Sequence, residues 1–475
     1  MSIPQPVMTI PPELDAEMTS AVRVYVLSIL STMQHLQGRV DELESKVGKL
    51  TPQNSSVPPS TQHPHGKPKL PKPKSKRPRG GQPGHKKHSR ELIPVEQCTA
   101  VIALHPPECR CCGKSLSGAD AHPLRHQIWE LPEIKPVITE YQRHRLTCSS
   151  CGTSTCAALP VGVPNGQSGP RLLAFTGLLM GHFRQSKRRA AMFLQDFLKM
   201  PCSPSLTVKM QNHVGEALAA PYEELKSALN QESQLFMDES PTKQGTQKAW
   251  LWTAVAPLFA VFAIFSSRKG EALPKLLGAA FSGVINCDRA KMYWQISRLQ
   301  WCWAHLKRDF QALIDHSDNQ VKRLGHDLMR EVRKMFHLWH RYRAGEIVWS
   351  TFQKGMRPIR VKVNALLLRG ARSGNLRLMG MCKELHQHRD WLWTFCFVQG
   401  IEPTNNAAER ALRPAVIHRK LSFGTQSESG SRFIERMLTV SETCRLQNRS
   451  VFTFLTEAVE AHFNATTAPS LLPNP

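Results

Sequence analysis

The chain has 475 residues, enough for several domains with a substantial core. Its 62 Lys and Arg outnumber 37 Asp and Glu, and the formal net charge of +25 favours a polyanionic partner over an acidic small molecule. The N-terminus lacks the features of a signal peptide, and the apolar stretch 249–265 contains Pro257 and is short of the roughly 20 residues of a membrane span.

Nucleic acid is therefore the first candidate partner, ahead of an anionic membrane. The 13 cysteines, an odd number without a secretion signal, favour reduced thiols and metal ligation in a cytoplasm. We expect a cytoplasmic protein, associated with the nucleoid when bound to DNA, and no membrane partner.

Residues 22–50 carry a heptad pattern, after an N-terminal segment, 1–21, that we expect to be disordered. One apolar seam position is held by Val26, Met33, Val40 and Val47, and the other by Val22, Ile29, Leu36, Leu43 and Leu50. β-Branched residues at most a positions with mainly leucine at d favour a parallel two-stranded coil. We predict a coiled coil that makes a homodimer; the alternative is an amphipathic helix packed on its own domain.

Residues 51–93 are rich in Pro, Lys, Ser and Gly, a composition that cannot supply a packed core. We predict a basic disordered linker. Its dense positive charge is suited to a phosphate backbone, and the DNA-binding candidates are Lys74, Lys76, Arg77 and Arg79.

Two cysteine pairs lie in the predicted domain 94–160, and their members are Cys109, Cys112, Cys148 and Cys151. Each pair is separated by two residues and followed by glycine, so both sulfurs can turn onto one tetrahedral ion. We predict structural Zn²⁺ in a small zinc-ribbon-like domain. The alternatives are a redox dithiol or a chance cluster, and further thiols nearby are Cys98, Cys111 and Cys156.

Residues 161–230 indicate helices. A basic turn with the DNA-binding candidates Lys187, Arg188 and Arg189 opens one helix, and a second follows a short break. Such a pair forms either a helix-turn-helix that binds DNA or a scaffold hairpin, which is the commoner case.

A mixed α/β domain is predicted over residues 231–425. The run 233–238 indicates a strand stopped by Asp238, residues 248–257 and 258–265 a buried hairpin, 271–280 a short helix and 283–288 a strand ending in Asp288. A helical crossover places the last strand parallel to and beside the first. Asp238 and Asp288 are then neighbours at one edge of the sheet.

Two close carboxylates need a cation or a shared proton, and a hard divalent metal with oxygen ligands meets that need. Glu409 completes the set in the early turns of a helix that Thr404 can cap, and Arg413 follows one turn later where it would meet a bound phosphate. Taken singly, each acid has a structural explanation as a strand-end or capping residue.

An α-helical insertion is predicted at about 295–400, dense in Arg, Lys, His and Trp. Cys302 and His305 are three apart on one helical face, but two ligands are too few for a metal, and His305 is a candidate for packing or DNA contact. Residues 426–475 are predicted as a C-terminal helix, from Ser431 to Phe463, and a tail.

Several strings are similar to one known family. They are Asn54-Ser-Ser-Val-Pro-Pro-Ser, Gly80-Gly-Gln-Pro-Gly-His, the two cysteine pairs, Met237-Asp-Glu-Ser, Cys302-Trp-Ala-His-Leu-Lys-Arg, and Asn405-Asn-Ala-Ala-Glu-Arg-Ala-Leu-Arg-Pro followed by Arg419-Lys420. With these strings the chain resembles, over nearly its whole length, the bacterial transposases of the insertion sequence sixty-six family, the TnpC-like branch of the DDE class. The family usually has Asp at Thr404 and Thr at Ser240.

The resemblance implies a multidomain α/β protein with an RNase H-like catalytic core, a mixed sheet with helices, in which Asp238, Asp288 and Glu409 bind metal. It also implies a DNA transposase, a polynucleotidyl transferase that cuts mobile-element ends and joins them to target DNA. Two Mg²⁺ ions, or Mn²⁺, would serve the phosphoryl transfer.

The partners are then the terminal repeats and target DNA, a second copy of the chain, and accessory proteins from the same element. Further DNA-binding candidates beside the triad are Arg410, Arg413, Arg419 and Lys420. Two rival functions are a dimeric zinc DNA-binding protein without catalysis and a metal-dependent DNA nuclease without strand transfer.

Overall fold

The structure, a computed structural model, describes residues 18–47, 90–278 and 280–473. It divides into a small unit, residues 63–137, and a larger unit made of the rest, and each is considered by itself. The linker candidates Lys74, Lys76, Arg77 and Arg79 lie outside the described residues, as do residues 1–17 of the segment predicted to be disordered.

The predicted heptad segment is one helix, α2 (Ser20–Val47). Four seam residues whose side chains are described, Val22, Ile29, Met33 and Leu36, are open to solvent within the single chain, with 42–58% exposure. The helix agrees with the heptad pattern, while its pairing with a second copy stays a prediction. Leu50, the last seam residue, lies outside the described residues.

The cysteine-rich region has little regular structure. In the small unit it holds the single-turn helix η2 (Val95–Gln97) and an isolated bridge between Glu108 and Ser115. In the larger unit, β1 (Arg145–Thr147) and β2 (Ser154–Cys156) form a short antiparallel hairpin.

Four helices follow, namely α3 (Pro170–Gly181), α4 (Lys187–Leu198), α5 (Pro204–Ala217) and α6 (Ala219–Ala228), and then the single turn η3 (Leu229–Gln231). Ser186 and Ser203 cap α4 and α5, since each hydroxyl accepts a backbone N–H three residues later. α5 packs against α3 and α4, and also against the C-terminal helices. This region is therefore part of the main core.

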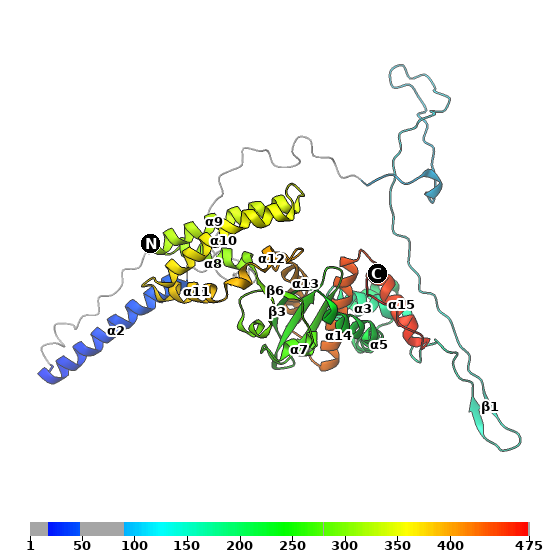
Figure 1. Ribbon diagram of the computed structural model, residues 1–475. Coiled ribbons are helices and arrows are strands. Elements are labelled where there is room, and N and C mark those ends of the chain that lie inside the picture. The colour runs from blue at the N-terminus through cyan, green and yellow to red at the C-terminus, as the bar shows by residue number, and fades with distance from the viewer. Residues whose placement is uncertain (1–17, 48–89, 279, 474–475) are drawn as a thin grey trace. The chain divides into compact units, whose positions relative to one another are not determined.

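The central sheet has five strands in the order β5-β4-β3-β6-β7. They are β3 (Gln234–Gln244), β4 (Gln247–Val255), β5 (Ala260–Phe265), β6 (Val284–Cys287) and β7 (Leu299–Trp301). β3, β4 and β5 form an antiparallel meander, and β6 lies parallel to β3 after a crossover through α7 (Ala272–Leu277). The predicted hairpin and the predicted neighbourhood of the first and fourth strands are confirmed (Figure 1).

Two features of the sheet differ from the sequence-based expectation. β3 does not stop at Asp238 but runs on to Gln244, because β4 continues to pair with it through Gln244 and Gln247, and Gly245 forms the turn at φ +59°. β7 falls inside the range predicted as a helical insertion, and three residues are too few for a recognisable strand pattern.

The chain between β6 and α13 is mainly helical. After η4 (Lys291–Gln295) and β7 it forms α8 (Trp303–Ile314), α9 (Asn319–Arg343), α10 (Trp349–Ala371), α11 (Leu376–Gln387), η5 (Arg389–Leu392) and α12 (Thr394–Phe397). Its two ends are tied together, since the Trp303 N–H donates to the Pro403 carbonyl at 2.9 Å and the Trp303 indole N–H to the Leu392 carbonyl at 2.7 Å.

Three helices complete the described chain, namely α13 (Asn406–Ser422), α14 (Glu428–Leu446) and α15 (Val451–Phe463). The prediction of one helix from Ser431 to Phe463 is wrong, because the chain turns after Leu446, where Asn448 has φ +54°. α13 and α14 cover one face of the sheet, and α7 lies in the apolar core of the other (Figure 1).

α14 also covers the outer edge of β5. The N–H groups of Ala260 and Phe262 donate to the hydroxyls of Thr443 and Thr439 at 3.2 and 3.0 Å, and the N–H of Ile264 donates to Glu435 Oε1. The helix therefore supplies the acceptors that a sixth strand would otherwise provide.

Among the helices of the described ranges, none combines the length and apolarity needed to cross a membrane.

Candidate active site

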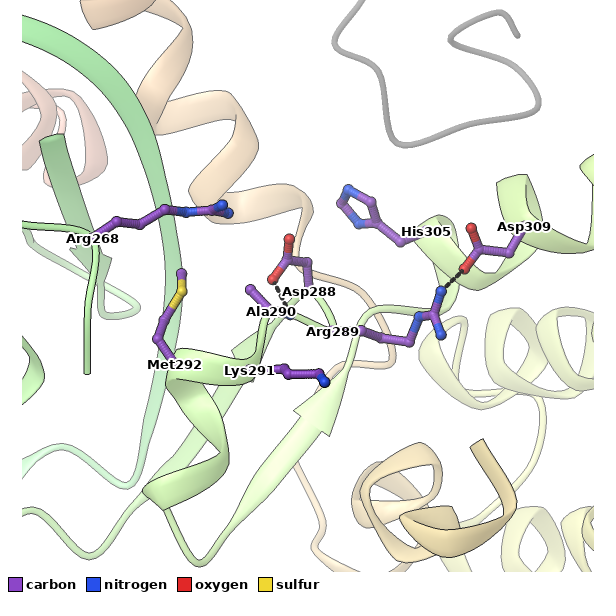
Figure 2. A pocket seen from close by; sticks show the side chains of 8 residues that line it. All are labelled: Arg268, Asp288, Arg289, Ala290, Lys291, Met292, His305 and Asp309. Atoms are coloured by element: carbon purple, nitrogen blue, oxygen red, sulfur yellow. Dashed lines mark hydrogen bonds and ion pairs between the residues drawn. The ribbon is translucent and has the colours of Figure 1, made fainter. Parts of the chain in front are cut away.

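Asp238 and Asp288 lie level on neighbouring parallel strands. Phe236 of β3 pairs with Asn286 of β6, and each aspartate is two residues farther along its chain. The Asp288 carboxylate accepts the Ala290 N–H at 2.8 Å (Figure 2). Asp238 accepts the N–H of Glu239 at 2.9 Å.

The electrostatics of Asp238 show that the acids act on one another. Burial raises the pKa of its carboxyl well above the usual range, and Glu239, Asp288 and Glu409 raise the pKa further. Asp238, Asp288 and Glu409 come from β3, the end of β6 and the first turn of α13, and the last two are near enough to affect the pKa of Asp238.

The start of α13 is fixed to the sheet by buried amides. The Asn405 side-chain amide donates to the Met237 carbonyl of β3 at 2.7 Å, and the Asn286 amide of β6 donates to the Thr404 carbonyl at 3.2 Å. The prediction that Thr404 caps this helix is wrong. Asn405 holds the N-cap position without a capping bond, because its side chain is used across the sheet instead.

Glu409 reaches toward the first turn of α8. One carboxylate oxygen is 3.6 Å from His305 Nδ1, and the other is 3.7 Å from a guanidinium nitrogen of Arg308. Both distances exceed a hydrogen bond, and Glu409 Oε1 and His305 Nδ1 are buried without a hydrogen-bond partner.

A fourth carboxylate, Glu239, was missed by the sequence analysis. Arg268 donates to it twice, at 2.6 and 2.9 Å, and the Tyr293 hydroxyl donates at 2.7 Å. Burial and Asp288 raise the pKa of Glu239, while the bonds from Tyr293 and Arg268 act in the opposite direction. Glu239 is part of the family-like string Met237-Asp-Glu-Ser, but only Asp238 of this string was predicted to belong to the site.

A cavity of about 450 Å³ opens beside Asp288. Figure 2 shows Asp288 with Arg268 on one side and His305 on the other, and Arg289 and Lys291 complete a basic lining. Arg289 is held away from Asp288 by Asp309 of α8 at 2.8 Å and Glu384 of α11 at 2.9 Å. A basic wall around the half-buried Asp288 suits an anionic group bridged by a cation.

A family model described as Transposase IS66 family matches residues 165–432, more than half of the chain. The chain belongs to this family. A second model, described as Family of unknown function (DUF6444), matches residues 5–91.

Two curated relatives come from Sinorhizobium fredii (strain NBRC 101917 / NGR234). "Uncharacterized protein y4qI" is 22% identical over 81% of this chain and 74% of its own length. "Uncharacterized protein y4hP" is 24% identical over 73% of this chain and 69% of its own length.

Membership of the IS66 family implies a transposase enzyme that binds DNA and uses divalent metal ions. The residues at the site fit such an ion, because Asp238 and Asp288 lie at matching positions on neighbouring strands and Glu409 Oε1 is buried without a hydrogen-bond partner. Over the described residues, the two groups whose ligand atoms all lie within 4.8 Å are Cys302, His305 and Glu409, and His213, Glu216 and His462. The three predicted acids are not such a group.

The two cysteine pairs form the same backbone turn. The N–H of Gly113 donates to the Cys109 carbonyl at 2.9 Å, and the N–H of Gly152 donates to the Cys148 carbonyl at 2.9 Å; both glycines have φ +70°. Hydrogen bonds from the turn lower the pKa of Cys109 and of Cys151. Each pair, taken by itself, has the turn of a metal-binding knuckle.

The remaining basic candidates lie on two helices. Lys187, Arg188 and Arg189 are exposed in the first turn of α4, and Arg410, Arg413 and Lys420 are exposed on α13. Arg419 instead donates to the Ser240 hydroxyl at 3.3 Å and to the Pro241 carbonyl of β3. Arg419 thus has a structural role in joining α13 to the sheet.

Proposed function

We propose that this protein is a DNA transposase that cleaves the ends of a mobile element and joins them to target DNA. The observation that carries the proposal is the placement of the acids: Asp238 and Asp288 lie two residues beyond paired positions of the parallel strands β3 and β6, and Glu409 opens a helix that is hydrogen-bonded to both strands. A basic cavity lies beside Asp288. An antiparallel meander followed by two parallel strands is the sheet expected of an RNase H-like core, and it supports that assignment.

In this proposal Asp238, Asp288 and Glu409 hold two Mg²⁺ or Mn²⁺ ions. When bound, the ions would supply activation of water and then of a 3′-hydroxyl for attack, and stabilise the leaving oxygen. Arg268 and Lys291, which line the cavity, would orient the phosphodiester by charge-assisted contacts, and His305 lines the same cavity. Arg289, tied to Asp309 and Glu384, would position α8 and α11 around the bound DNA.

The other parts of the chain would bring DNA to this site. We assign the exposed basic turn of α4 and the exposed bases of α13 to phosphate contacts, together with the basic linker. A coil through α2 would pair two protomers across two element ends.

Replacing Asp288 with Asn tests the catalytic assignment. The variant should bind a labelled element end as the wild type does but lose Mg²⁺-dependent cleavage, because an amide cannot supply the negative charge that the ion needs. Asp315→Asn, an exposed acid just after α8, is the matched control and should retain cleavage. Cleavage by the Asp288→Asn variant at the wild-type rate would exclude the proposed site.

The same labelled end separates the rival functions. Binding without cutting indicates a dimeric DNA-binding protein, cutting without joining indicates a nuclease, and cutting with joining to a second DNA indicates a transposase. The turn of each cysteine pair supports structural Zn²⁺ at Cys109, Cys112, Cys148 and Cys151. Metal analysis of the purified protein should find zinc, and Cys148→Ser should lower its content; an unchanged zinc content would contradict this assignment.

A further inference from the structure

Cys302 and His305 open α8 and have no part in the proposed reaction as metal ligands. Cys302 is at the N-cap position and only 1% exposed, and His305 follows one turn later on the same face. Glu409 of α13 approaches from the other side, so that one ligand atom from each of the three residues lies within 4.8 Å of the others.

Two polar atoms in this cluster lack hydrogen-bond partners, although Glu409 has the ion-pair neighbours His305 and Arg308 at 3.6 and 3.7 Å. His305 Nδ1 and Glu409 Oε1 are buried, lie 3.6 Å apart and form no hydrogen bond. The side-chain oxygen of Asn405, Oδ1, is also buried without a hydrogen-bond partner. A buried nitrogen and a buried carboxylate oxygen left unsatisfied are costly, which points to an absent ligand. Because the atoms face one another at the separation of two ligands on one ion, a cation fits better than a water-filled gap.

The environment of the sulfur also resembles that of a metal ligand. The Asn405 N–H donates to Cys302 Sγ at 3.1 Å, a bond of the kind that orients and tunes a metal-bound thiolate. The Cys302 N–H donates to the Cys287 carbonyl at 2.9 Å, so the backbone that carries the sulfur is fixed to β6. The sulfur is therefore held in place before any ion binds.

We propose that Cys302, His305 and Glu409 bind a zinc ion, at a site distinct from the all-oxygen site of the cleavage reaction but sharing Glu409 with it. Thiolate and imidazole ligands select Zn²⁺ or Co²⁺, whereas Mg²⁺ prefers oxygen. Three protein ligands leave a fourth position for water or a phosphate oxygen, and His305 also lines the cavity beside Asp288.

Binding exchanges a proton for the metal. The S–H bond of Cys302 breaks, its proton passes to solvent, and the sulfur donates its electron pair to the ion; His305 binds as neutral imidazole and Glu409 as carboxylate. No oxidant or reductant is required. An ion held in this way would draw Glu409 away from Asp238 and Asp288, so zinc would compete with the ions that support cleavage.

Cobalt titration of the full-length, metal-stripped protein tests the site, because thiolate-bound Co²⁺ has a charge-transfer absorption. Cys302→Ser and His305→Ala should each bind one equivalent less than the wild type, and Cys302→Ser should also lose the corresponding absorption. Cys382→Ser, which removes an equally buried thiol on α11, should bind as the wild type does. Cobalt bound by the cysteine pairs and by the exposed group His213, Glu216 and His462 is the same in the wild type and in each variant. The difference in stoichiometry therefore reports on the proposed site alone.

Equal stoichiometry in the wild type and in a folded His305→Ala variant would overturn the proposal, with near-ultraviolet circular dichroism as the check of folding. If Cys302→Ser does not fold, His305→Ala decides alone. Asp288→Asn should keep the cobalt equivalent while losing cleavage. If the wild-type protein binds the cobalt equivalent but does not cleave DNA, the zinc site stands and only the proposed function is refuted.

Discussion

Asn405 shows how one buried residue can position a charged one four places later. It is 1% exposed, its amide donates to Met237 of β3, and its backbone N–H donates to Cys302 before α8. Three elements thus meet at the residue that precedes α13. The direction in which Glu409 leaves the helix is set by this contact and not by a helix cap.

We predict that Asn405→Ala destabilises the protein by about 1–3 kcal/mol, because the buried Met237 carbonyl loses its donor. Urea unfolding measures the change. Asn406→Ala is the matched control, since its side chain is exposed on the first residue of the same helix, and it should change stability by less than about 0.5 kcal/mol. Equal effects of the two substitutions would mean that the Asn405 amide contributes nothing specific.

Glu239 shows where sequence reasoning about the site was incomplete. Adjacent residues of a strand point to opposite faces, so a pattern that places Asp238 in the site gives no reason to expect Glu239 there. Its partners, Arg268 and Tyr293, lie beyond two further strands and after β6, and only the folded sheet brings them together. By contrast, Asp238 and Asp288 could be paired from sequence, because one crossover rule relates their strands.

At the scale of elements, α14 is fitted to the edge of β5 by a row of polar side chains one helical turn apart. Glu435, Thr439 and Thr443 accept from alternate N–H groups of the strand. Glu435 is the titratable member of this row. Its burial raises the pKa to about 7 despite the Arg432 guanidinium 3.0 Å away.

This pKa gives a pH-dependent stability with a definite sign. The folded protein binds the Glu435 proton more tightly than the unfolded chain, whose carboxyl has a pKa near 4.5. The free energy of unfolding should therefore fall as pH rises from about 4.5 to about 7, by roughly 3 kcal/mol. Glu435→Gln keeps the acceptor oxygen and should flatten this part of the profile.

Denaturant unfolding at a series of pH values measures the effect. Glu428→Gln, an exposed substitution in the first turn of the same helix, should leave the slope unchanged. A wild-type slope in the Glu435→Gln protein would show that this carboxyl does not carry the dependence.

Helices and strands with a long apolar pattern could be predicted from the sequence, whereas short strands and turns could not. The hairpin of β4 and β5 and the helix α2 have long apolar patterns and appear in the structure. β7 has three residues, and the turn at Asn448 interrupts an otherwise continuous amphipathic segment without a glycine or proline to mark it. Such breaks are decided by tertiary packing, which a local pattern does not contain.

At the scale of the whole molecule, the open seam of α2 predicts the oligomeric state. A chain that begins at Thr51 should sediment as a monomer, whereas the full chain should be a dimer, because the exposed apolar seam needs a partner. An unchanged oligomeric state after the deletion would remove this role from the helix.

Two point variants sharpen that comparison. Ile29→Lys places a charge on the seam and should weaken the dimer, while Val24→Lys, on the outer side of the heptad, should not. Similar dissociation of both variants would indicate general destabilisation of α2 and not a specific seam.

The bond between Trp303 and Pro403 closes the helical excursion at its base. When the two ends of a segment are bonded together, the entropy cost of closing the loop depends only weakly on the length of the segment, since this cost grows with the logarithm of the length. The helices of this segment that contribute nothing to the site, α9 and α10, can therefore diverge or change length, whereas α8 and α11 are constrained by His305, Asp309 and Glu384. What selection must preserve is the neck itself, because its geometry sets where the acids on either side of it meet.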